Sequence, residues 1–79
     1  MTDDPTSPRY PDCTVVLSGT SVHAVSIMMK VRRGLARYLR DTGMPVEKVE
    51  AVTQEFMDEA QSGDYDNVLI TAMRWVTVD

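Results

Sequence analysis

The chain has 79 residues, of which 43% are hydrophobic and 25% charged, and a formal net charge of −4. A chain this short buries only about 60% of the surface it exposes when unfolded, so we expect one small domain that gains stability by self-association. The single cysteine, Cys13, excludes an intramolecular disulfide and fits a reducing compartment. The longest apolar run, residues 27–29, is far shorter than the roughly 20 residues of a membrane-spanning helix. No export signal is recognisable near the start, so we expect a cytoplasmic protein without membrane contact.

Residues 1–11 are expected to form a flexible tail. Pro5, Pro8 and Pro11 each lack a backbone donor and push the preceding residue out of helical geometry. Residues 12–79 are then expected to fold as a single small helical domain.

A short strand is predicted at residues 13–18, because apolar and polar side chains alternate there. Gly19 is expected to end this strand. Cys13, Val15 and Leu17 share one face and Thr14, Val16 and Ser18 the other, as expected of a half-buried strand.

A long first helix is predicted at residues 22–42, which contain no proline and are followed by Gly43, a residue typical of helix ends. At about 100° per residue, its apolar side chains cover an arc of roughly 200°, wider than one packing contact needs. This excess is the main reason to expect a homodimer or a bound partner. Arg32 lies inside the apolar arc, where it must reach the rim along its aliphatic stem or find a carboxylate.

Two further helices follow. Pro45 suits the first turn of the second helix, which we expect to end near Gln61, and Asp64 is the predicted N-cap of the third. Residues 75–78 are rich in β-formers, so they either complete the third helix or form a short strand against the first strand. The predicted fold is therefore mainly α with a short N-terminal strand, in the order β-α-α-α, or the same fold with a C-terminal strand.

The charge is sorted by segment. Residues 22–43 hold five basic residues and one acidic, whereas residues 44–66 hold one basic and seven acidic. One interpretation is that the two oppositely charged helices are antiparallel neighbours, within the chain or across a dimer, whose rims attract each other. The other is a phosphate-binding strip on the first helix, formed by Lys30, Arg33, Arg37 and Arg40.

No catalytic residues, cofactor or metal site are predicted. Cys13 and His23 could act as a nucleophilic pair only if the turn at Gly19 brought them together, and we expect His23 to cap a helix or face solvent instead. The run Asp64-Tyr65-Asp66 begins like a calcium loop, but the regular spacing of further ligands and the closing glutamate are missing from the sequence. Helix capping accounts for both carboxylates.

The chain is rich in methionine, with six in 79 residues. Methionine on an apolar face either fills an irregular core or forms an adaptable partner-binding surface. Those that lie on or beside the predicted apolar faces are Met28, Met29, Met57 and Met73.

Several motifs carry a resemblance to a known family. They are Tyr10-Pro11-Asp12, Val15 with Leu17 and Gly19, Ser62-Gly63-Asp64-Tyr65-Asp66, and Met73-Arg74-Trp75-Val76. On these residues the chain resembles a family of small uncharacterised proteins of actinobacteria and especially of their phages. The resemblance covers roughly residues 10–78. It implies a phage or actinobacterial origin and brings no known catalytic residues.

Taken together, these patterns predict a non-enzymatic protein that acts through protein–protein contacts, as a small homo-oligomer or by binding a host protein through an exposed helix face. The alternative is a small nucleic-acid-binding regulator that uses the basic face of the first helix. The acidic net charge of the whole chain opposes this alternative at long range. Asp64 is expected to have a structural role only.

Overall fold

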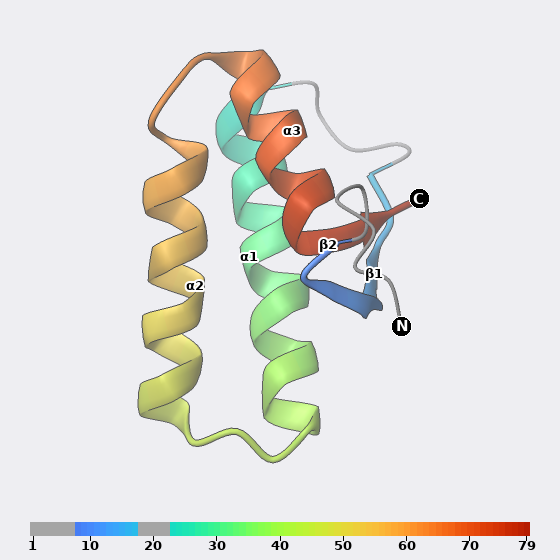
Figure 1. The fold of residues 1–79 in the computed structure, drawn as a ribbon, viewed down its shortest axis with the longest axis vertical. Helices are drawn as coiled ribbons and strands as arrows, with labels where there is room; N and C mark the ends of the chain where they lie inside the picture. The colour runs from blue at the N-terminus through green and yellow to red at the C-terminus, as the bar shows by residue number, and fades with distance from the viewer. Residues whose placement is uncertain (1–7, 18–22) are drawn as a thin grey trace.

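The computed structural model describes residues 8–17 and 23–79, and Figure 1 shows the arrangement of their helices and strands. The predicted fold class is confirmed, including the C-terminal strand. The two strands lie on the far side of α1 and α3 from α2 (Figure 1). The elements in chain order are β1 (Tyr10–Val15), α1 (Ala24–Asp41), α2 (Val46–Ala60), α3 (Tyr65–Trp75) and β2 (Val76–Val78).

Strand β2 pairs with β1 in parallel, with Tyr10 opposite Val76 and Val15 opposite Val78. The register is irregular, because β1 bulges between Tyr10 and Thr14. Inside the bulge the hydroxyl of Thr77 donates to the Pro11 carbonyl at 2.7 Å, so this carbonyl keeps a partner although the ladder is interrupted.

The folded part of the chain begins earlier than expected, which corrects the boundary of the predicted tail at residues 1–11. The backbone N–H of Arg9 donates to the carbonyl of Arg74 at 2.7 Å, and β1 starts at Tyr10. Pro11 is tolerated in β1 because a proline in a bulge needs no backbone donor. Residues 1–7 lie outside the described part of the chain.

The predicted strand at residues 13–18 is shifted towards the N-terminus, since β1 ends at Val15. The predicted alternation is nevertheless present, because Cys13 and Val15 are buried and Leu17 is partly buried, whereas Thr14 and Val16 are exposed. Residues 18–22, which include the predicted strand end and the first predicted residue of the helix, lie outside the described residues.

Helix α1 ends as the sequence predicts. Gly43 adopts a φ of +91°, a left-handed conformation that favours glycine. Its N–H donates to the Arg40 carbonyl at 3.0 Å, and the Met44 N–H donates to the Leu39 carbonyl at 3.1 Å. These bonds satisfy two carbonyls that a helix end leaves unpaired. The turn directs α2 back along α1, and the two helices are antiparallel (Figure 1).

Helix α1 is the central element, because β1, α2 and α3 all pack against it. Three neighbours explain the width of its apolar arc, which therefore does not by itself require a second copy of the chain. Within the arc, the exposed side chains are Val25, which is 65% exposed, and Met29, which is 40% exposed. The arc residues that are fully buried are Ile27, Met28, Val31, Leu35 and Leu39.

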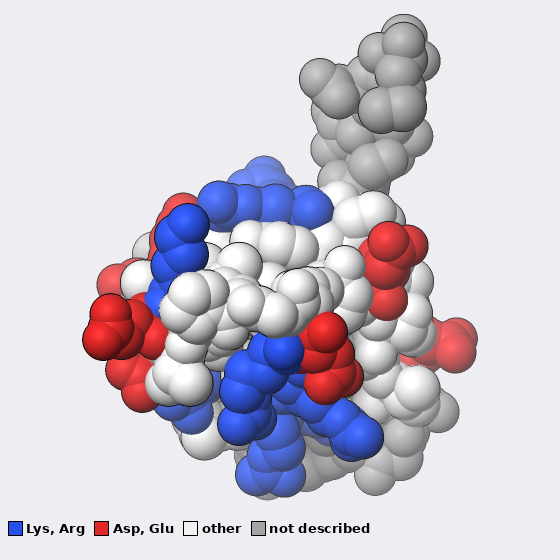
Figure 2. Space-filling model, turned by 90° about the horizontal axis from the view of Figure 1, so that it is seen from below, with Lys and Arg blue, Asp and Glu red and all other residues white. Residues whose placement is uncertain are grey.

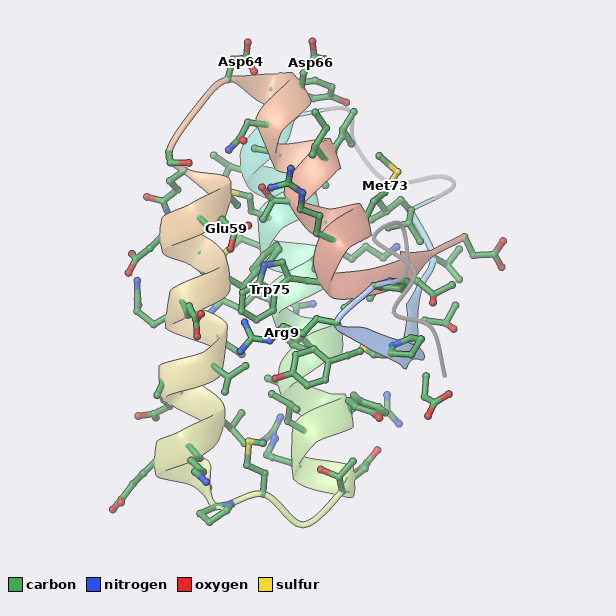
Figure 3. All side chains as sticks on the ribbon, in the orientation of Figure 1. Arg9, Glu59, Asp64, Asp66, Met73 and Trp75 are labelled. Atoms are coloured by element: carbon green, nitrogen blue, oxygen red, sulfur yellow. The ribbon has the colours of Figure 1, made fainter. Side chains whose placement is uncertain are left out.

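The indole of Trp75 connects β1, α2 and α3 (Figure 3) and is only 2% exposed. Its ring meets the edge of Phe56 with the centroids 5.7 Å apart, and it lies 6.1 Å from the ring of Tyr10. Its Nε1–H donates to Oε2 of Glu59 at 3.1 Å. The guanidinium of Arg9 lies 4.6 Å from the ring centroid, which places a cation over the indole.

Gly34 lets β1 cross closely over the middle of α1. A Cβ atom at this position would lie 2.9 Å from Cγ2 of Val15, closer than side chains tolerate. The thiol of Cys13 also contacts the Gly34 carbonyl, at 3.7 Å. The glycine therefore sets the spacing between the helix and the strand.

Gly34→Ala is expected to destabilise the protein, although alanine favours a helix by about 1 kcal/mol. Val15 is β-branched and buried, so it cannot turn away, and overpacking costs about 1–3 kcal/mol. In a Val15→Ala background the same substitution should become stabilising, because the clashing methyl group is gone. Chemical denaturation of the wild type, both single variants and the double variant measures the coupling between the two positions. If the changes in the free energy of unfolding simply add, the contact between Gly34 and Val15 does not cause the destabilisation.

Glu59→Ala is expected to lower the free energy of unfolding by about 1–2 kcal/mol, because it leaves the buried Trp75 N–H without an acceptor. Glu59→Gln retains an acceptor and should cost less. Glu55→Ala is the matched control on the same helix. It removes only the exposed ion pair with Arg9 and should cost less than about 1 kcal/mol. Equal losses from the two alanine variants, measured by thermal unfolding, would contradict this role of Glu59.

Candidate functional site

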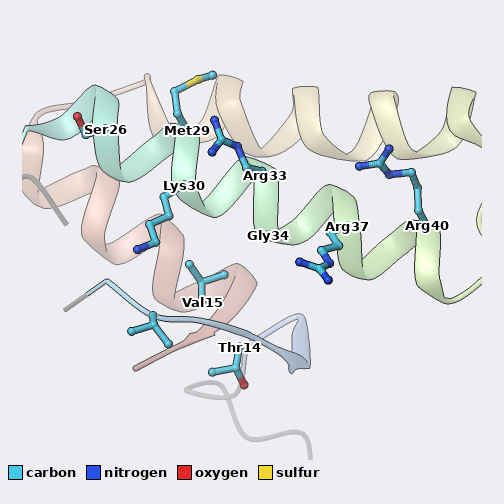
Figure 4. Close-up of a pocket in the computed structure, with 10 residues that line it drawn as sticks. Thr14, Val15, Ser26, Met29, Lys30, Arg33, Gly34, Arg37 and Arg40 are labelled. Carbon is cyan, nitrogen blue, oxygen red and sulfur yellow. The ribbon is translucent and has the colours of Figure 1, made fainter. Parts of the chain in front are cut away.

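A groove of about 730 Å³ runs between α1 and the C-terminal end of β1 (Figure 4). It is termed the α1–β1 groove. All four cations that the sequence singles out line it, together with an apolar and hydroxyl-bearing floor. The lining residues are Thr14, Val15, Val16, Ser26, Met29, Lys30, Arg33, Gly34, Arg37 and Arg40.

The four cations share the groove because they recur every three or four residues along α1, the spacing that places side chains on one helix face. Arg40 lies in the last turn of α1, where a positive charge is favoured by the helix dipole. Lys30 and Arg33 lie too far from the helix end for this effect. Capping of the dipole therefore accounts for only part of the basic face.

Three of these cations make no ion pair with a described carboxylate. Acidic side chains nevertheless lie near them, since Asp12 and Asp41 line a neighbouring depression together with Arg37. Within residues 8–17 and 23–79, no Asp or Glu oxygen lies within 4.0 Å of the guanidinium of Arg33, Arg37 or Arg40. Lys30 makes an interaction of its own and is not counted with them. Seen from below, a group of Lys and Arg side chains lies together in the lower centre of the surface (Figure 2).

Two carboxylates of the acidic helix α2 pair with arginines that lie outside α1. Glu55 pairs with Arg9 at 3.2 Å, and Glu59 lies 4.0 Å from Arg74 of α3. Helices α1 and α2 are antiparallel neighbours as predicted, but among the described residues no ion pair joins them. The predicted attraction between their rims therefore does not take the form of direct pairs.

Arg32 takes the first of its two predicted options. Its side chain is exposed, and in the described part of the chain no carboxylate oxygen lies within 4.0 Å of its guanidinium. It lies beside a shallow depression between α1 and α2 that is also lined by Glu50. The long aliphatic stem thus carries the charge out of the apolar arc to the rim.

Two exposed apolar side chains border the cations. Val16 is 49% exposed and Met29 is 40% exposed, and both line the α1–β1 groove. The methionines divide between the two predicted roles, since Met28 is buried and Met57 partly buried, whereas Met29 and Met73 are exposed. Met29 is the one that lies in the groove.

Cys13 and His23 have different surroundings. The Cys13 thiol is buried under α1, and burial raises its pKa, which disfavours the reactive thiolate. His23 is exposed at the N-cap position of α1 and makes no side-chain capping bond there. The environment of Cys13 is therefore the opposite of that of an activated nucleophile.

Asp64 caps α3 as predicted. Its carboxylate accepts a hydrogen bond from the backbone N–H of Asn67 at 3.1 Å, and Asp66 adds a negative charge to the first turn. Across the described residues, no group of three or more His, Cys, Asp or Glu side chains is arranged to hold a metal ion. Both carboxylates lie at the N-terminal end of α3 (Figure 3).

The sequence predicts the cationic side of the groove but not the side formed by the strand. Val16 follows β1 and is exposed because it alternates with the buried Val15, a pattern that the sequence already contains. Gly34 was a second signal, since a single glycine inside a helix often marks a close packing contact. Neither residue shows by itself which helix the strand crosses.

A scan of protein-family models finds no match to this chain, and searches of curated proteins and of solved structures also find none. Among the residues that the structure describes, no helix has both the length and the apolarity to cross a membrane.

Asp64→Ala is expected to lower the free energy of unfolding by about 1 kcal/mol, because the first turn of α3 loses its capping acceptor. Asp64→Asn keeps an acceptor oxygen and should remain within about 0.5 kcal/mol of the wild type. Asp66→Ala is the control for loss of charge without loss of the cap. Chemical denaturation in the presence and absence of calcium checks the structural role; a calcium-dependent gain in stability that is lost with Asp64→Ala would contradict it.

Proposed function

We propose that the protein acts without catalysis, by binding another protein, and that the α1–β1 groove is its contact surface. The proposal is carried by the four cations that line this groove, three of which have no carboxylate oxygen within 4.0 Å among the described residues. The proposed partner presents a segment rich in Asp and Glu.

Close like charges make an anionic partner favourable. Arg33 and Arg37 are four residues apart on one helix face, where like charges repel by about 0.2–0.5 kcal/mol. Arg40 follows three residues later, in the last turn. Carboxylates in the groove would replace this repulsion with attraction, and the covered surface would weaken screening by solvent and salt.

The apolar residues in the groove favour a protein partner over a bare polyanion. Val16 and Met29 are 49% and 40% exposed beside the cations. A protein segment can cover these side chains while it pairs with the arginines, whereas a phosphate backbone offers no apolar surface to them. Methionine adapts well to such a contact because its side chain is unbranched and flexible.

The resemblance to small proteins of actinobacteria and their phages gives the proposal its setting. The proposed site of action is the cytoplasm of the bacterial host, and the proposed partner is a host protein. A homodimer and a nucleic-acid complex are the competing outcomes of the experiment.

The test measures binding of fluorescently labelled poly-L-glutamate and of labelled duplex DNA by anisotropy at one fixed salt concentration. Arg33→Gln combined with Arg37→Gln is expected to weaken binding of poly-L-glutamate about five- to thirtyfold, as for the loss of two contacts of about 0.5–1 kcal/mol each. The matched control combines Arg32→Gln with Lys48→Gln, which removes the same charge outside the groove and should change affinity little.

Three results would overturn the proposal. If both double variants bind poly-L-glutamate equally weakly, the net charge of the protein determines the affinity and no defined site is involved. Tighter binding to duplex DNA than to poly-L-glutamate would favour the nucleic-acid alternative. Self-association in analytical ultracentrifugation that disappears in the Arg33→Gln, Arg37→Gln variant would make the partner a second copy of this chain.

A further inference from the structure

Among the described residues, one edge of β1 has no partner strand, and this edge borders the α1–β1 groove. β1 pairs with β2 along its other edge, and the described residues place no further strand in the sheet. The Val15 carbonyl accepts from the Asp79 N–H and the Leu17 N–H donates to the Asp79 carbonyl, both at 3.0 Å. Val15 and Leu17 therefore face β2. Because backbone groups alternate in an extended chain, the N–H and C=O of Val16 point to the open edge.

This part of the edge lacks the usual protection. Natural edge strands are commonly blocked by prolines, bulges or charged side chains. In β1, Pro11 and the bulge between Tyr10 and Thr14 block the N-terminal half. Thr14 and Val16 are exposed and carry neither a proline nor a charge. The accessible stretch is therefore residues 14–16, which line the groove.

The orientation of the strand suits an added segment. Cys13 and Val15 are buried under α1, whereas Thr14 and Val16 are exposed on the opposite side of the strand. A segment that pairs with this edge would alternate in the same way, so every second side chain would face α1. In Figure 4, β1 runs alongside α1, and the side chain of Arg37 extends from the helix towards the strand.

The spacing of the arginines fits alternate residues of a strand. Arg33 and Arg37 are separated by four residues, which is about 6 Å along a helix axis. Alternate residues of a strand are about 6.6 Å apart. Carboxylates at every second position of an extended segment would thus lie opposite successive arginines.

We propose that the acidic partner binds as an added β-strand, an inference that rests on the function proposed above. An extended segment with Asp or Glu at alternate positions pairs with residues 14–16, and its backbone exchanges hydrogen bonds with the N–H and C=O of Val16. Its carboxylates face Arg33 and Arg37, and its remaining side chains lie beside the exposed Val16. Main-chain bonds supply affinity in this mode of recognition, and the side chains supply specificity.

The experiment compares synthetic peptides of the same composition. One alternates Glu and Val, the second groups all its Glu residues together, and the third is the alternating peptide with every second backbone amide N-methylated. The alternating peptide is expected to bind about tenfold more tightly than the grouped one, because only the alternating order lets the edge hydrogen bonds form while carboxylates face both arginines. N-methylation of the amides that face β1 should abolish this advantage, and the Val16 amide should exchange its hydrogen more slowly in the complex.

Variants of the protein test the edge directly. Val16→Pro removes the edge N–H and should reduce binding of the alternating peptide to the level of the grouped one. Val16→Thr is the matched control, since it keeps the N–H and the β-branched shape. Circular dichroism checks folding; if Val16→Pro does not fold, the N-methylated peptide decides the question alone.

The failures of the two proposals are distinguishable. Equal affinity for the alternating and grouped peptides, with both weakened by Arg33→Gln and Arg37→Gln, would overturn the added strand and leave the acidic-partner proposal in place. No measurable binding of either peptide or of poly-L-glutamate would overturn both.

Discussion

Burial of the Trp75 indole joins the start of β1 to α2 and to the end of α3. The ring packs against Phe56 of α2 and Tyr10 of β1, its N–H bonds to Glu59, and Arg9 lies over its face. An indole has a large apolar surface and one polar N–H that needs a partner. Here the aromatic rings cover the apolar surface and Glu59 accepts from the N–H. Because Trp75 is the last residue of α3, its position determines where the helix ends and where β2 can begin beside β1.

The groove follows from this arrangement. β2 occupies one edge of β1 and leaves the other edge beside α1, and Gly34 allows the strand to approach the helix closely. Arg9 and Arg74 come to lie near carboxylates of α2 because β1 and β2 pair. The acidic helix is thus partly neutralised without the cations of α1, which remain along the groove. The charge separation seen along the sequence is therefore not cancelled between the two helices that carry it.

Local features of the fold could be predicted, and features that depend on neighbours could not. The helices, the Asp64 cap and the left-handed Gly43 follow from helical periodicity and from backbone preferences of single residues. The C-terminal strand could be stated only as an alternative, because residues 75–78 continue the helical spacing of the third helix and are also rich in β-formers. Arg9 was assigned to the tail because of the prolines around it, and its contact with Glu55, 46 residues away, leaves no local signal in the sequence. The wide apolar arc of α1 suggested a second chain, yet three elements of the same chain cover most of it.

The sequence by itself determined that four cations share one face of α1, since spacing along a helix is fixed by short-range backbone geometry. The tertiary structure alone decided three further features. Within the described part of the chain, Arg33, Arg37 and Arg40 make no ion pair, Val16 lies at a strand edge without a partner strand, and these residues border one groove. The physical reason is the separation along the sequence of the residues that interact. The face of a helix depends on residues three or four positions apart, whereas ion pairing and strand pairing depend on distances between segments that the packing of Trp75 and Gly34 brings together.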